Sequence, residues 1–198
     1  MPEPEVMKDH EVVSIFPFSD EEIDELLNDA RECVLMWGTQ DGWPVGVLHQ
    51  FFWKDGKFWI TCTANRHRVS AIKRDPRVSV SVSAMVAFNF EQRGAVTAKG
   101  RAVVHEDRET KDWFYPALAG KAMGDDEAAV ASFVERLDSP LRIVIEVTPE
   151  KWITFNGTKA DRMVRGELPR EEMGPRLSSD GARMRAAREE RGLDPDAR

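Results

Sequence analysis

Polar and apolar residues alternate in several short runs of this chain. Residues 77–83 (RVSVSVS) alternate strictly, which is typical of a strand with one buried face. Between residues 34 and 63, three runs rich in β-branched and aromatic residues are separated by Asp-Gly pairs at 41–42 and 55–56. Asp-Gly between such runs is a strong signal for a hairpin turn. The pattern predicts a three-stranded meander over residues 34–63 and a fourth strand over residues 77–83.

Two later segments continue the strand pattern. Residues 95–106 (AVTAKGRAVVHE) resume it, with Gly100 marking a bulge or a close backbone approach. Residues 141–147 (LRIVIEV) predict a strand that ends at Pro149, and residues 151–155 (KWITF) continue the sheet or lie at its rim. Closing six antiparallel strands into a small barrel would remove their exposed edges. We therefore expect a mainly β fold with peripheral helices, built on a six-stranded antiparallel barrel.

The helical segments lie around these strands. Ser19 and Asp20 are N-cap candidates for a short amphipathic helix over residues 19–31, and a basic helix over residues 64–75 ends before Pro76. Apolar stripes over residues 107–138 predict a helical insert of two short helices. We expect one barrel domain over residues 1–160, followed by a charged extension over residues 161–198 that is helical or disordered.

Composition excludes several classes of protein. The net charge of −7 over 198 residues argues against nucleic acid as the main partner. No run approaches the roughly 18 to 20 apolar residues that cross a bilayer, and the acidic start lacks the apolar region of a secretory signal, so we expect a cytoplasmic protein without membrane contact. Cys33 and Cys62 form no C-x-x-C pair, so neither a disulfide framework nor a metal site is expected.

The candidate chemistry lies where the third predicted strand meets the basic helix. The strand ends in Thr61, Cys62 and Thr63, and Arg66, His67 and Arg68 open the helix. Free backbone N–H groups, the positive end of the helix dipole and guanidinium groups all favour a phosphate at such a point. The alternative is that these basic residues form a solvated helix face, and the periodicity does not decide between the two.

The same region resembles the pyridoxamine 5′-phosphate oxidase-like superfamily, the flavin- and deazaflavin-binding split barrels. Residues 75–79 (DPRVS) fit the strand that follows the basic turn in that family, and the meander and residues 96–104 (VTAKGRAVV) extend the similarity to about a third of the chain. A weaker similarity to the closing strand of the family covers residues 149–163.

This resemblance implies a homodimer with an FMN lodged between the subunits. The flavin carries the hydride chemistry, so no catalytic residue is assigned; a nicotinamide donor would reduce it and a small organic acceptor would reoxidise it. The implied cofactor-binding residues are Arg66, Arg68, His67 and Lys73 at the phosphate, Thr61, Cys62 and Thr63 along the ring or its side chain, and the backbone of Val47, Leu48, His49 and Gln50 at the polar edge of the ring.

The departures from the family pattern limit this reading. The vitamin oxidases carry an Arg-x-Val-x-x-Lys run on the second strand, whereas residues 45–50 (VGVLHQ) contain neither Arg nor Lys. Of their substrate-binding ending, only Asp161-Arg162 has a counterpart. The resemblance therefore implies a flavin reductase rather than the vitamin B6 oxidase.

Two alternatives stay open on the same fold. A deazaflavin coenzyme, with its longer acidic tail, would use Arg66, Arg68, Lys73 and Arg74 along the groove. A non-enzymatic protein that binds or senses a flavin or haem is the other, since fold does not fix function. His49, among aromatic residues, is either a neighbour of the flavin or a buried, hydrogen-bonded core histidine.

Overall fold

The computed structural model describes residues 13–196, apart from the side chains of residues 178–180. The chain forms two compact units. One unit is the continuous stretch Ser19–Ile153, and the other joins the chain up to Phe18 to the chain from Thr154.

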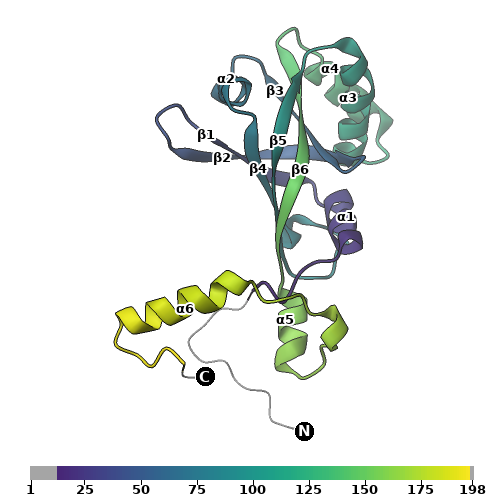
Figure 1. The fold of residues 1–198 in the computed structure, drawn as a ribbon. Coiled ribbons are helices and arrows are strands. Elements are labelled where there is room, and N and C mark those ends of the chain that lie inside the picture. The colour runs from purple at the N-terminus through teal and green to yellow at the C-terminus, as the bar shows by residue number, and fades with distance from the viewer. Residues whose placement is uncertain (1–12, 197–198) are drawn as a thin grey trace. The chain divides into compact units, whose positions relative to one another are not determined.

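The first unit is a closed barrel of six antiparallel strands in the order β1-β2-β3-β6-β5-β4 (Figure 1). Helices lie around the barrel, so the expected fold class is confirmed: mainly β, with peripheral helices. The strands are β1 (Glu32–Gly38), β2 (Pro44–Lys54), β3 (Lys57–Thr63), β4 (Arg77–Ser83), β5 (Gly94–His105) and β6 (Arg142–Asn156).

The two Asp-Gly pairs form the predicted turns. Between β2 and β3, Asp55 and Gly56 both have positive φ angles, 55° and 71°. This is the backbone of a tight two-residue hairpin turn, whose twist matches that of the flanking strands. Between β1 and β2, Gly42 has a φ of 88° and the Thr39 N–H donates to the Trp43 carbonyl at 2.9 Å. The three-stranded meander therefore forms as predicted.

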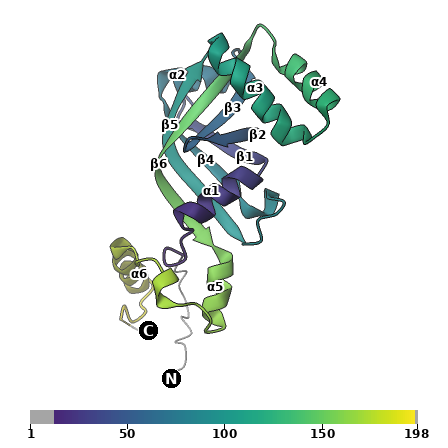
Figure 2. The same cartoon turned by 90° about the vertical axis from the view of Figure 1, so that its right-hand side faces the viewer.

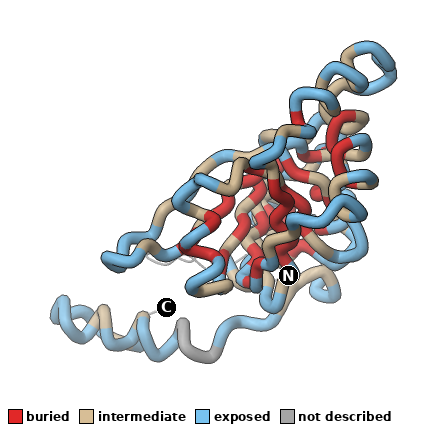
Figure 3. Tube along the Cα trace, turned by 90° about the horizontal axis from the view of Figure 1, so that it is seen from above, coloured by how far each residue is buried: buried red, intermediate tan, exposed pale blue. Residues whose placement is uncertain are grey.

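Alternating side chains fill the barrel interior. On β4, Val78, Val80 and Val82 are buried, whereas the serines between them are only partly buried. Across the β1–β2 pair, Leu35 faces Val47 and is fully buried, so this row of side chains points inward. Figure 3 shows the buried positions gathered in the interior and the exposed positions at the periphery.

Helices cover the barrel where its strands leave apolar surface. The barrel unit contains α1 (Asp20–Asp29), α2 (His67–Arg74), the 3-10 turn η1 (Ala84–Val86), α3 (Arg108–Met123) and α4 (Glu127–Leu137). The predicted insert is the pair α3–α4, which packs on the outer surface of β3 and β6 (Figure 2). Its apolar cluster joins Trp59 and Val144 of the sheet to Phe114, Tyr115, Leu118 and Leu137 of the helices.

Residues 151–155 continue the last strand, which was one of their two predicted placements, but Pro149 does not end it, because β6 runs through it to Asn156. The reason lies in the pairing: β3 flanks β6 only from Arg142 to Val147, so the missing N–H of Pro149 interrupts no pairing with β3. Gly100 of β5 makes the close approach that the sequence suggested. A Cβ atom on Gly100 would lie 2.2 Å from the Thr148 carbonyl oxygen, so β5 and β6 come together here only because position 100 has no side chain.

The second unit contains the end of β6, the segment 13–18, α5 (Gly157–Val164), the 3-10 turn η2 (Arg170–Glu172) and α6 (Ser178–Glu190). The Asn156 N–H donates to the Phe16 carbonyl, and the buried Asn156 side chain caps α5 by accepting from the Lys159 N–H. The weaker sequence similarity over residues 149–163 therefore covers a strand end and a helix, and α5 was not predicted. The helix α6 lies in the charged extension over residues 161–198.

Candidate functional site

The connection from β3 into α2 brings basic side chains to one end of the barrel. Arg66 is the N-cap residue, with an extended backbone and no capping hydrogen bond from its side chain. The buried residues of α2 are Val69, Ala71 and Ile72, and these fix the helix against the barrel. We name the end of β3, the start of α2 and the start of β6 the basic corner.

Arg68 points from α2 toward the barrel interior. Its guanidinium carbon lies 5.5 Å from the centre of the Trp37 ring, and the inward-facing Cys62 thiol is a second neighbour. The Arg68 Nε atom is buried and has no hydrogen-bond partner. A buried donor without a hydrogen-bond partner lowers stability by about 1 to 3 kcal/mol. An acceptor that binds here would therefore form a hydrogen bond that the protein alone does not supply.

His49 faces the same interior from β2. It lies opposite Cys33, whose side chain is buried. Burial, together with the charge of Arg68, lowers the pKa of His49 to about 4, so its imidazole is neutral at neutral pH. Its Nε2 atom is buried and has no hydrogen-bond partner among the described residues.

A third arginine completes the basic corner. Arg142 begins β6 directly opposite Thr63, and its Nε atom is also buried without a partner. Burial raises the pKa of the Cys62 thiol, while the charges of Arg68, Arg142 and Arg66 act in the opposite direction. Arg142 could not be predicted from the sequence, because only the pairing of β3 with β6 brings it beside Thr63, which lies 79 positions earlier.

The other predicted residues are placed as follows. Arg66 and His67 are exposed at the turn, and Val47 and Thr63 are half-buried. Thr61 donates its hydroxyl proton to the Ile143 carbonyl at 2.7 Å. Leu48 and Gln50 lie on the outer face of β2, where Leu48 is 64% exposed. Lys73 forms an ion pair with Glu106 at 2.8 Å, and Arg74 donates to the Gly38 carbonyl at 3.1 Å.

The structure therefore brings together His49, Cys62 and Arg68 from the predicted set and adds Trp37. Arg142 lies at the same end of the barrel, but its register places it on the outer face of the sheet, near Tyr115 of α3. The structure directs Lys73 and Arg74 to other partners. Within the described part of the chain, no acidic side chain pairs with Arg66, Arg68 or Arg142. A cationic corner with orphaned buried donors and no carboxylate fits the phosphate of a cofactor such as FMN.

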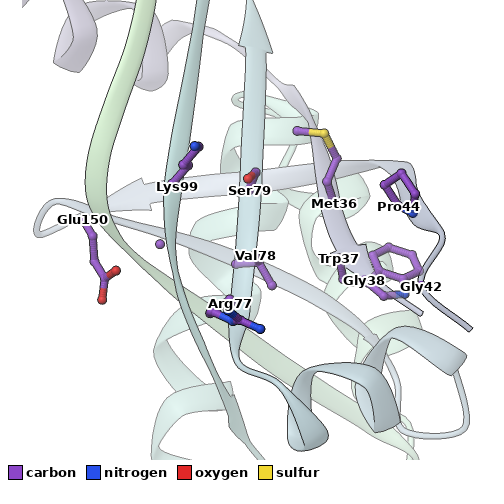
Figure 4. A pocket seen from close by; sticks show the side chains of 11 residues that line it. Met36, Trp37, Gly38, Gly42, Pro44, Arg77, Val78, Ser79, Lys99 and Glu150 are labelled. Carbon is purple, nitrogen blue, oxygen red and sulfur yellow. The ribbon is translucent and has the colours of Figure 1, made fainter. Parts of the chain in front are cut away.

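A hollow of about 510 Å³ is lined by residues of β1, β4 and β5 and shares Trp37 with the basic corner (Figure 4). Two of the charged side chains at its border are already paired: Arg77 with Asp75 at 2.6 Å, and Glu150 with Arg101 at 2.8 Å. Its lining residues are Met36, Trp37, Gly38, Gly42, Pro44, Arg77, Val78, Ser79, Lys99, Gly100 and Glu150.

The fold and the corner together define a six-stranded antiparallel split barrel with a basic turn after its third strand. The family model for pyridoxamine 5′-phosphate oxidase matches residues 19–156, so the chain belongs to that family. The family match confirms the resemblance seen in the sequence. The motifs specific to the vitamin oxidases are incomplete in this chain. Among curated proteins, no sequence matches this chain.

Solved structures show the same fold at low sequence identity. A conserved hypothetical protein from Mycobacterium tuberculosis superposes with a TM-score of 0.64 at 19% identity, covering 78% of this chain and 93% of its own. General Stress Protein 26 from Bacillus anthracis superposes with a TM-score of 0.51 at 18% identity, covering 68% of this chain and 92% of its own. HutZ, described as a haem storage protein from Vibrio cholerae, superposes with a TM-score of 0.50 at 15% identity, covering 70% of this chain and 94% of its own. At these identities the similarity establishes the fold.

Among the described residues, no helix is both long enough and apolar enough to span a membrane.

Proposed function

We propose that this protein is a flavin-dependent oxidoreductase that holds the phosphate of FMN in the basic corner. Membership of the pyridoxamine 5′-phosphate oxidase family supports a flavin, and the corner supplies the matching charge. When bound, FMN supplies the hydride or electron transfer to a small organic acceptor, with a nicotinamide as a suitable donor. The chain itself binds, orients and desolvates the cofactor.

One observation carries this proposal: three polar atoms around the corner are buried without partners. They are Arg68 Nε, Arg142 Nε and His49 Nε2, and they come from α2, β6 and β2. Polar groups buried without a hydrogen bond are rare in folded proteins because each is destabilising. A phosphate that accepts from the Arg68 guanidinium would satisfy a donor that the protein alone leaves open.

We further propose that the flavin lies between two copies of the chain. The outer face of β1 and β2 exposes apolar side chains, among them Leu48 at 64% and Trp43, on the adjoining turn, at 68%. Gly46 keeps this face flat, since a Cβ there would come within 2.9 Å of Val34. Large exposed apolar side chains in one area are typical of a protein interface.

The test combines cofactor titration with a charge-matched control. Arg68→Ala removes a charge-assisted contact worth about 1.5 to 3 kcal/mol, so FMN affinity should fall about 10- to 150-fold. Arg101→Ala removes an exposed arginine paired with Glu150 and should leave the affinity unchanged. Light scattering with and without FMN measures the dimer. Equal FMN affinity in the unsubstituted protein and Arg68→Ala would refute the phosphate site.

Arg142 favours a second candidate, the deazaflavin coenzyme. Its tail carries more negative charge than FMN, and a third unpaired arginine offers it a further contact. Binding of the deazaflavin, but not of FMN, in a fluorescence titration would select this alternative. A bound flavin that no nicotinamide donor reduces would instead favour a storage or sensing role.

A further inference from the structure

His49 is a titratable residue of β2 that lies close to Arg68 of the basic corner. The titratable and charged groups that face it are Arg68 from α2 and Cys33 from β1, and Cys62 from β3 is a neighbour of Arg68. No described acidic side chain forms an ion pair or hydrogen bond with His49. Its surroundings therefore contain a positive charge and a buried thiol, but no counter-ion.

These surroundings explain why the imidazole is neutral. Burial removes water from the ring, and Arg68 adds repulsion, so both act against the imidazolium and hold its pKa at about 4. A neutral imidazole has one N–H donor and one acceptor nitrogen. An anion next to Nε2 is repelled when that atom is the acceptor, and it is bound more strongly when both ring nitrogens carry protons.

We propose that His49 takes up a proton when a tetrahedral dianion binds in the basic corner, and that it thereby strengthens binding in mildly acidic solution. This inference rests on the proposed phosphate site and adds a pH-responsive binding residue to it. The dianion opposes the repulsion from Arg68 and provides the acceptor that protonated Nε2 requires.

The sign of the effect follows from linkage. The anion raises the pKa of His49 above its value in the free protein, so protons are taken up on binding at any pH between the two values. Affinity for the anion therefore rises as the pH falls through the pKa of the complex. The rise levels off near pH 4, where the free protein is itself protonated.

Sulfate is a suitable probe, because it stays a dianion over the whole range whereas phosphate itself titrates near pH 7. The pKa of His49 is measured by NMR of the imidazole in the full chain, with sulfate or with chloride at equal ionic strength. We expect sulfate to raise this pKa by about two units, and sulfate affinity therefore to rise about tenfold from pH 7 to pH 5. His49→Gln should remove that pH dependence. His67→Gln, at the exposed turn, is the matched control and should retain it.

The outcomes separate this inference from the proposed function. If sulfate and FMN bind but the pKa of His49 does not move, and affinity is the same at pH 5 and pH 7, the inference is wrong and the phosphate site stands. If neither ligand binds, both are wrong. Loss of the pH dependence in His67→Gln alone would assign the proton to the exposed turn and overturn the role of His49. Should His49→Gln fail to fold, the titration of the unsubstituted protein still decides.

Discussion

Gly100→Ala tests the contact between β5 and β6 that closes the barrel. The added Cβ would lie 2.2 Å from the Thr148 carbonyl oxygen and 3.1 Å from the Pro149 Cα atom, and both of these are backbone atoms. Ordinary contacts of this kind begin near 3.4 Å, so the two strands must separate by about 1 Å. No flexible side chain can move to relieve the clash.

Overpacking of a close contact costs about 1 to 3 kcal/mol, and we expect the upper end here because backbone must move on two strands. For a chain of this size, about 3 kcal/mol lowers the melting temperature by roughly 6 to 12 °C. Thermal and urea unfolding, followed by circular dichroism, measure both quantities.

Gly120→Ala is the matched control, because it makes the same chemical change on α3, where nothing lies within 4 Å of the added atom. It should stabilise the protein by up to about 1 kcal/mol through its helix propensity. The two substitutions should therefore act in opposite directions. A Gly100→Ala variant as stable as the unsubstituted protein would show that β5 and β6 do not approach each other as described.

Three further substitutions test other parts of the barrel unit. Although burial opposes it, hydrogen bonds from Lys57 and His105 hold the pKa of Glu146 below its ordinary value. The ionised Glu146 therefore stabilises the fold at neutral pH, and this contribution is lost as the pH falls below about 4.5. Glu146→Gln should lower the free energy of unfolding, measured with urea, by about 1 to 3 kcal/mol at pH 7. The difference between the variant and the unsubstituted protein should shrink toward pH 4. Asp29 accepts hydrogen bonds from the backbone N–H groups of residues 88–90, and Asp29→Ala should raise amide hydrogen exchange in that loop, with exchange in β3 as the unchanged reference. Phe114 of α3 is fully buried between the insert and the sheet. Phe114→Ala should therefore destabilise the protein by about 3 to 5 kcal/mol, measured by the same urea unfolding. A loss below about 1 kcal/mol would contradict the packing of α3 on the sheet.

Most of the fold could be predicted because its signals are local. Strict alternation marked β4, and each Asp-Gly pair marked a turn that needs positive φ angles. The end of β6 could not be predicted in this way. Whether a proline interrupts a strand depends on the partner that its missing N–H would face, and that partner comes from pairing distant in sequence.

The candidate site was harder to predict than the fold. Arg66 and Arg68 have equal weight in the sequence, yet Arg66 is exposed at the N-cap while Arg68 turns inward over Trp37. Successive helical residues differ by about 100° in direction, so neighbours of one chemical type need not share surroundings. Arg142 reaches the corner through the β3–β6 register, which no local pattern reveals. Whether these residues hold a cofactor remains a prediction.

The insert α3–α4 has a consequence for how this chain can be shortened or recombined. Trp59 and Val144 project from the sheet into the cluster that these helices bury. A variant in which a short turn replaces residues 107–138 would keep every strand but expose a strip of apolar surface to water. Such surfaces promote aggregation. The hairpin of helices therefore has to be transplanted together with the two strands beneath it, as one piece, in any chimaera with a relative.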